Sequence, residues 1–260
     1  YSERGKATYM GKDLTEVRSP HRKLMPDTVG SEQHEPTSLR AIANKAKADK
    51  QHRFRDLYRC LNAELLLDCW RDLNKDAASG VDGETAQTYA ENLHTNIEVL
   101  VERLKSKRYR AKLVRRHYIP KEQGKERPLG IPAIEDKLVQ AACAKLMTAI
   151  YEQDFLESSY GYRPERGAGD AVKDLTFDLQ FGNYGYVVEA DVKGFFDHLD
   201  HDKLLAMLSL RIDDRAFLSL IRKWLKAGIL ETDGHVVHPD TGTPQGGVVS
   251  PVMANVYLHY

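Results

Sequence analysis

The stretch YVVEADVKGFFDHLDH, Tyr186–His201, sets the frame for interpreting the whole chain. Its first residues are mostly apolar, which predicts a strand over residues 186–191 in a sheet covered on both faces. A carboxylate at the end of a buried strand, here Asp191, is costly unless a cation meets it. Magnesium prefers such oxygen ligands, and the carbonyl of Val192 would add one more. The alternative, that Asp191 only caps the following turn, stays open.

The residues after Asp191 add to this pattern. Gly194 permits a close approach of the backbone to a ligand, and Phe195 and Phe196 would either close the floor of a pocket or pack in the core. His198 and His201 flank Asp200, which raises the question of zinc, but no third ligand supports it. Asp200 as the cap of a helix is the favoured interpretation.

A second informative stretch, TPQGGVVSP, occupies residues 243–251. Two glycines beside Gln245 offer backbone N–H groups and a side-chain amide to a bound substrate. A plain surface loop rarely needs Gln-Gly-Gly between two prolines, so this loop is predicted to serve a binding site together with Asp191.

The most basic part of the chain lies at residues 103–127, where two short runs flank Gly124 and predict a hairpin. Tyr109 and Tyr118 are interleaved with the charges. Two interpretations of this stretch are therefore about equally favoured: a phosphate-binding surface, and a charged hairpin that is merely solvated. Eleven cations face only Glu122 and Glu126: Arg103, Lys105, Lys107, Arg108, Arg110, Lys112, Arg115, Arg116, Lys121, Lys125 and Arg127.

The remaining elements give an α+β order rather than a regular βαβ array. Helices are predicted from the apolar spacing within residues 38–75, 84–106, 133–155, 201–212 and 214–227, and in the last ten residues. Asp213 or Asp214 would cap one of them, and a ribbon would turn at Asp233-Gly234. Arg163 and Arg166 precede a further helix and would suit phosphate at its start.

Composition restricts the function only weakly. Basic and acidic residues number 38 each, so a charged partner must be sought in local patches. Three cysteines without a zinc-ligand pattern fit a reducing compartment, and no run of about 18 apolar residues predicts a membrane span. Residues 1–37 are polar and aperiodic, which predicts a loosely ordered leader.

Several blocks of this sequence resemble, in order and spacing, those of group II intron-encoded reverse transcriptases. The resemblance covers about residues 38–260 and rests on consecutive motifs rather than one short match. The blocks are SLRAIANKAKADKQHRFRDLY (38–58), KDAASGVDGET (75–85), YIPKEQGKERPLGIPAIEDKLVQAA (118–142), DFLESSYGYRPERGAGDAV (154–172), YVVEADVKGFFDHLDHDKLL (186–205) and GTPQGGVVSPVMANVYLHY (242–260).

The resemblance implies a right-hand polymerase fold and two-metal nucleotidyl transfer with Mg²⁺. Asp191 matches the first metal-binding carboxylate, with the Val192 carbonyl beside it, and Phe196 matches the aromatic gate that excludes a 2′-hydroxyl. The positions implied for the incoming nucleotide are Lys121, Arg127 and Gln245. Those implied for template or intron RNA are Arg115, Arg116, Arg163, Lys45, Lys47 and Arg53.

By the same resemblance, residues 1–37 are a leader, 38–110 a helical extension, 111–185 the fingers, and 186–260 an incomplete palm with interleaved fingers helices. The implied partners are an RNA template, intron RNA, a DNA primer and dNTPs in the bacterial cytoplasm or nucleoid, or in an organelle, without a membrane. A homodimer is left open. The family's paired aspartates do not occur after Gln245, so the isolated piece is expected to be inactive.

Two alternatives compete with an intron-resident polymerase that assists splicing and retrohoming. The same blocks occur in domesticated relatives with CRISPR-associated, defence, diversity-generating or DNA-repair roles. A second alternative is a non-catalytic RNA-binding module that supports splicing.

Overall fold

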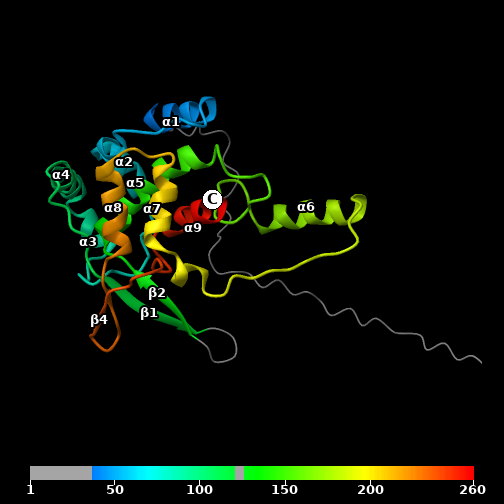
Figure 1. The fold of residues 1–260 in the computed structure, drawn as a ribbon. Coiled ribbons are helices and arrows are strands. Elements are labelled where there is room, and N and C mark those ends of the chain that lie inside the picture. Colours follow the sequence, from blue (N-terminus) through cyan, green and yellow to red (C-terminus); the bar gives the residue numbers. More distant parts are fainter. Residues whose placement is uncertain (1–36, 121–125) are drawn as a thin grey trace, which may run out of the picture. The chain divides into compact units, whose positions relative to one another are not determined.

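The computed structural model describes residues 37–120 and 126–260 of the chain. The amino-terminal helices are shorter than their apolar spacing predicts, because a turn around residues 49–62 interrupts the first one. Asn62 ends this interruption: its side chain accepts a hydrogen bond from the Leu65 amide and so caps the next helix. The elements are α1 (Thr37–Ala48), a 3-10 turn (Leu57–Cys60), α2 (Ala63–Asp72), α3 (Ala86–Ala90) and α4 (Leu93–Lys105), shown in Figure 1.

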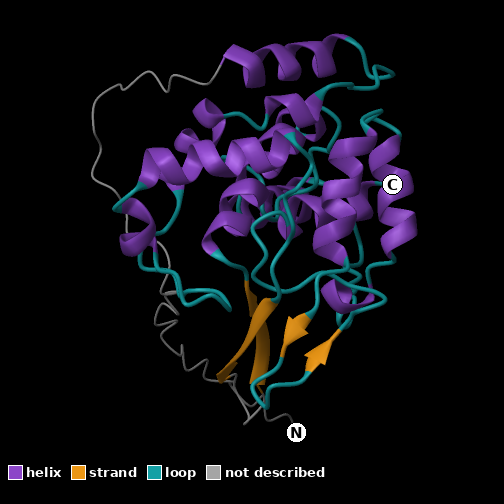
Figure 2. Cartoon of the chain, turned by 90° about the vertical axis from the view of Figure 1, so that its left-hand side faces the viewer, coloured by secondary structure: helices purple, strands orange, loops and turns teal. Residues whose placement is uncertain are grey.

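The predicted hairpin is confirmed as β1 (Val114–Pro120) paired antiparallel with β2 (Glu126–Ile131). The predicted ribbon is confirmed as β3 (Ile229–Leu230) paired antiparallel with β4 (Val236–Val237). β3 also pairs in parallel with β1, which gives one sheet in the order β2-β1-β3-β4 (Figure 2). Local turn chemistry predicts each hairpin, but the pairing between them joins segments more than a hundred residues apart.

Helix α5 (Ile134–Tyr151) lies at the centre of the core, where it packs against α1, α2 and α9 (Ser250–His259). Leu138 and Leu146 on α5 are fully buried. One continuous apolar cluster includes side chains from residues 39–155 and 204–256, so residues 38–110 share their core with the rest of the chain. A mixed helix-and-sheet fold is confirmed, while the limits of fingers and palm stay predictions.

Two predicted helix caps are confirmed. Helix α7 (His201–Ser209) begins where the Asp200 side chain accepts a hydrogen bond from the Lys203 amide at 2.9 Å. Helix α8 (Arg215–Leu225) begins where Asp214 accepts from the amides of Ala216 and Phe217. None of the helices in the described ranges is long and apolar enough to cross a membrane.

The predicted strand at residues 186–191 is wrong. This segment has extended backbone, but it pairs with no strand of the described ranges, and Val187 and Val188 are exposed. A strand forms only where neighbouring strands satisfy its N–H and C=O groups, and none lies beside this segment. The preceding helix α6 (Ala168–Phe181) likewise buries none of its side chains.

Candidate functional site

The loop at residues 241–249 joins three parts of the chain that are distant in sequence. Its Thr243 amide donates to the Phe196 carbonyl at 2.8 Å, within the turn that follows Asp191. Its Gln245 carbonyl accepts from the Gly130 amide of β2 at 2.6 Å. Its Val248 amide donates to the Gln140 side chain of α5 at 2.9 Å. The loop therefore fixes the post-Asp191 turn, the hairpin and the central helix relative to one another.

Two glycines make these close approaches possible. Gly242 has φ +84°, and a Cβ there would lie 2.7 Å from the Asp197 carbonyl oxygen. Gly246 has φ +107°, and a Cβ there would lie 2.7 Å from the Gly130 carbonyl oxygen. Both positions combine a left-handed backbone with a steric limit, so only glycine fits without displacement.

Arg127 and Gln245 meet at the exposed edge of this arrangement. The Nε of Arg127, on β2, donates to Oε1 of Gln245 at 3.0 Å. The terminal guanidinium nitrogens of Arg127 bond to none of the described residues, and the residue is exposed. A planar cation held in this way suits bidentate recognition of phosphate. Lys121, predicted for the same task, lies outside the described residues.

Phe196 belongs to the same arrangement, whereas the Asp191 side chain does not contact it. Phe196 lies in a 3-10 turn (Phe195–His198) that starts after Gly194, whose φ is +63°. The carbonyls of Phe196 and Leu199 accept from the Thr243 and Gly242 amides, at 2.8 and 2.7 Å. Asp191 and Val192 lie on the exposed segment before the turn, and their side chains bond to none of the described residues.

The exposed carboxylate of Asp191 has the chemistry of a magnesium ligand. Among residues 37–120 and 126–260, however, no group of three or more His, Cys, Asp or Glu side chains lies close enough to hold a metal ion. Magnesium usually takes one or two protein carboxylates and fills its shell with water and substrate oxygens. The roles of Asp191 and the Val192 carbonyl in such a shell stay predictions.

The two arginines at the start of β1 are engaged within the protein. Arg115 donates from Nε and Nη2 to the Ser79 carbonyl, at 3.0 and 2.6 Å. Arg116 pairs with Glu231 at 3.0 Å, and the Tyr118 hydroxyl donates to the second oxygen of the same carboxylate. These contacts tie β1 to neighbouring loops. Their role towards a template stays a prediction.

The other cations predicted for RNA differ strongly in environment. Arg163 is buried and donates to the Leu156 and Ser159 carbonyls while pairing with Glu152. Arg53 donates to the Ser209 carbonyl at 3.1 Å. Lys45 and Lys47 are exposed on α1, and Lys45 pairs with Asp49 at 3.8 Å. Arg166, named only as a helix-start cation, donates to the Glu157 carbonyl at 2.6 Å.

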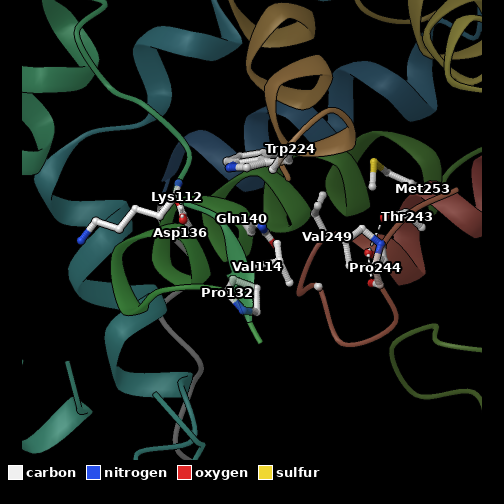
Figure 3. Close-up of a pocket in the computed structure, with 13 residues that line it drawn as sticks. Lys112, Val114, Pro132, Asp136, Gln140, Trp224, Thr243, Pro244, Val249 and Met253 are labelled. Atoms are coloured by element: carbon white, nitrogen blue, oxygen red, sulfur yellow. Dashed lines mark hydrogen bonds between the residues drawn. The ribbon is translucent and has the colours of Figure 1, made fainter. Parts of the chain in front are cut away.

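Sequence reasoning missed Gln140 and Asp136, which lie one turn apart on α5, where Gln140 faces the 241–249 loop and Asp136 lies beside Lys112 (Figure 3). They line a small cavity together with Lys112, Trp224, Thr243 and Pro244. Burial raises the pKa of Asp136 to about 6, although the Tyr109 hydroxyl and the Lys112 amide donate to its carboxylate. The signal for them in the sequence is that both are polar residues on the otherwise apolar face of a predicted helix.

Residues 119–260 match the family model described as reverse transcriptase (RNA-dependent DNA polymerase). The group II intron-encoded protein LtrA of Lactococcus lactis subsp. cremoris is 38% identical over 227 residues, covering 85% of this chain and 37% of the relative. Protein YkfC of Escherichia coli K12 is 39% identical, covering 69% of this chain and 48% of the relative. The uncharacterized 91 kDa protein in the cob intron of Schizosaccharomyces pombe is 37% identical, covering 79% of this chain and 25% of the relative.

A solved structure titled "Partial Cas6-RT-Cas1--Cas2 complex" aligns with 78% of this chain and 33% of that chain, at a TM-score of 0.50. Its 22% sequence identity shows a shared fold alone. The chain spans 25% to 48% of the length of the three curated relatives named above. The family match covers more than half of the chain and confirms the resemblance inferred from its motifs. The chain belongs to the reverse transcriptase (RNA-dependent DNA polymerase) family, on its group II intron-encoded, maturase-like branch.

Proposed function

We propose that this chain carries the nucleotide-binding part of a group II intron reverse transcriptase that copies RNA into DNA by two-metal nucleotidyl transfer. The observation that carries the proposal is the convergence of Arg127, Gln245 and Phe196 on one loop within the family-matched region. These residues come from three separate sequence blocks, and the loop hydrogen bonds hold them together before any ligand arrives.

The roles of the residues follow from their chemistry. Arg127 presents its terminal guanidinium nitrogens, which bond to none of the described residues, to the triphosphate of a dNTP, while Gln245 fixes the direction of that side chain. Phe196 supplies an apolar wall that leaves no room for a 2′-hydroxyl. Asp191 and the Val192 carbonyl would hold Mg²⁺, which when bound activates the primer 3′-hydroxyl and stabilises charge on the transferring phosphate. Lys121 is proposed as a second triphosphate cation.

We further propose that the whole protein binds its intron RNA and assists splicing and retrohoming. The name of the L. lactis relative as a group II intron-encoded protein supports this role. Lys45 and Lys47 are exposed on α1 and suit contact with RNA phosphates. The isolated 260-residue polypeptide is expected to be inactive in DNA synthesis, because two-metal transfer requires several carboxylates around the metals and no group of three metal-ligating side chains gathers among the described residues.

The test compares Asp191→Asn with Glu189→Gln in the full-length protein, because both changes remove one charge from the same exposed segment. With Mg²⁺, dNTPs and a primed RNA template, Asp191→Asn is expected to lower DNA synthesis about 100-fold or more, since it removes a metal ligand. Glu189→Gln is expected to retain synthesis. Intron RNA affinity, measured by filter binding, is expected to be unchanged in both.

Unchanged DNA synthesis by Asp191→Asn would overturn the metal assignment. A full-length protein that binds intron RNA and supports splicing, yet makes no DNA even as wild type, would favour the non-catalytic splicing module instead.

A further inference from the structure

Tyr162 combines an exposed side chain with an unfavourable backbone. Its φ is +56°, in the left-handed region that an aromatic residue rarely adopts. Its side chain is 65% exposed, so burial in the core does not explain why the chain keeps a tyrosine in this conformation. Backbone strain of this kind persists only where the surrounding structure holds the residue in place.

The residues on either side of Tyr162 hold it in place. The Gly161 carbonyl accepts a hydrogen bond from Nδ2 of Asn255, on α9, at 2.8 Å. The buried guanidinium of Arg163 donates to the Leu156 carbonyl at 2.7 Å and pairs with Glu152 at 3.0 Å. These contacts fix the residues on both sides of Tyr162 to α9 and to the segment that precedes the loop.

The ring that is held in this way packs against Phe196. The Tyr162 and Phe196 rings meet edge to face, with centroids 6.3 Å apart and an interplanar angle of 86°. The Phe196 ring also meets the Phe195 ring, with centroids 5.6 Å apart, and Phe195 meets Tyr257 of α9 at 6.1 Å. Phe196 therefore contacts two rings, and Tyr162 is the one that comes from the separate 157–166 loop.

We propose that Tyr162 is a positioning residue that fixes the ring of Phe196 and thereby sets how strictly the nucleotide site excludes ribonucleotides. The inference rests on the proposed gate role of Phe196. A steric gate discriminates only while its ring cannot swing aside, and an aromatic neighbour on a rigid loop restricts that motion. A dNTP has no 2′-hydroxyl to collide with the ring, so its use depends little on Tyr162.

The experiment measures kcat/KM for CTP and dCTP on one primed RNA template with the full-length protein. Tyr162→Asn removes the ring but tolerates the left-handed backbone, and it is expected to raise the CTP-to-dCTP ratio about three- to tenfold. Tyr162→Phe keeps the ring and is expected to match the wild type. Tyr162→Gly accepts the same backbone and serves as a second ring-free variant if the asparagine protein does not fold.

Phe196→Val separates the inference from the proposed function. It is expected to raise the same ratio, and adding Tyr162→Asn to it is expected to change nothing further, because the two rings act as one unit. An unchanged ratio in Phe196→Val overturns the gate itself. A raised ratio there, with no rise in the ring-free Tyr162 variants, overturns the positioning role alone. Equal loss of CTP and dCTP use in those variants shows a structural role and also overturns it.

Discussion

Arg127 shows how one contact prepares a side chain for its proposed ligand. Its Nε is hydrogen-bonded to Gln245, 118 residues away in the chain, so one edge of the guanidinium is fixed, while the other edge bonds to no residue in the described part of the chain. A lysine at this position would carry the same charge, but its single ammonium cannot bond to Gln245 and also present a planar fork to phosphate. A positive charge alone at this position is therefore expected to be insufficient for tight binding of the dNTP phosphates.

Arg127→Lys in the full-length protein is expected to raise KM for dNTPs about tenfold or more, because it removes a charge-assisted hydrogen bond. Arg110→Lys is the matched control, since Arg110 is exposed in the same basic stretch and bonds through its side chain to none of the described residues. Steady-state kinetics on a primed RNA template checks both. Similar KM values in the two variants would contradict the role of the fork.

At the scale of elements, the loop at residues 241–249 owes its position to close backbone contacts at Gly242 and Gly246. Gly246 approaches Gly130 of β2 so closely that no side chain fits between them. Gly234, in the turn between β3 and β4, has a comparable φ of +90°, but a Cβ there would meet open space. Alanine substitutions at Gly246 and Gly234 therefore separate the free-energy cost of a left-handed backbone from that of a steric collision.

Gly246→Ala is expected to lower the free energy of unfolding by about 2–4 kcal/mol, from backbone strain plus the collision with Gly130. Gly234→Ala is expected to cost about 1 kcal/mol, from backbone strain alone. Urea titration followed by circular dichroism measures both values. Equal losses would show that the close approach to β2 contributes nothing.

At the scale of the whole molecule, α5 joins the core to the candidate site. The helix packs against α1, α2 and α9. Near its start, Asp136 accepts a hydrogen bond from the Lys112 amide, just before β1, and Gln140 accepts one from the Val248 amide of the 241–249 loop. Burial raises the pKa of Asp136 from 3.8 to about 6. The folded state therefore favours the protonated acid more than the unfolded chain does. The stability that protonated Asp136 contributes to the protein is lost as pH rises from about 4 through about 6.

The free energy of unfolding is expected to fall by up to about 3 kcal/mol across this pH range through Asp136. Asp136→Asn cannot titrate, so its stability is expected to change less between pH 4 and pH 7. Asp233→Asn is the control, because Asp233 is exposed and the His235 amide lowers its pKa instead. Urea unfolding at several pH values tests this, and identical pH profiles for Asp136→Asn and the wild type would contradict it.

The sequence by itself determined the family and most of the secondary structure. Asp200 and Asp214 cap helices as predicted, and the turn at Asp233-Gly234 closes the ribbon as predicted. These features depend on residues a few positions apart, so the local order of side chains is enough to specify them. The motif blocks likewise carry the family in their order and spacing, which the family match confirms.

Only the tertiary structure decided which side chains meet. Arg127 and Gln245 converge, and Tyr162 packs on Phe196, while Arg163 turns inward to pair with Glu152. The predicted strand at residues 186–191 pairs with no strand in the described part of the chain. The physical reason is the same throughout: whether a cation binds a ligand or a carboxylate, and whether an apolar run becomes a strand, depends on what distant segments bring beside it.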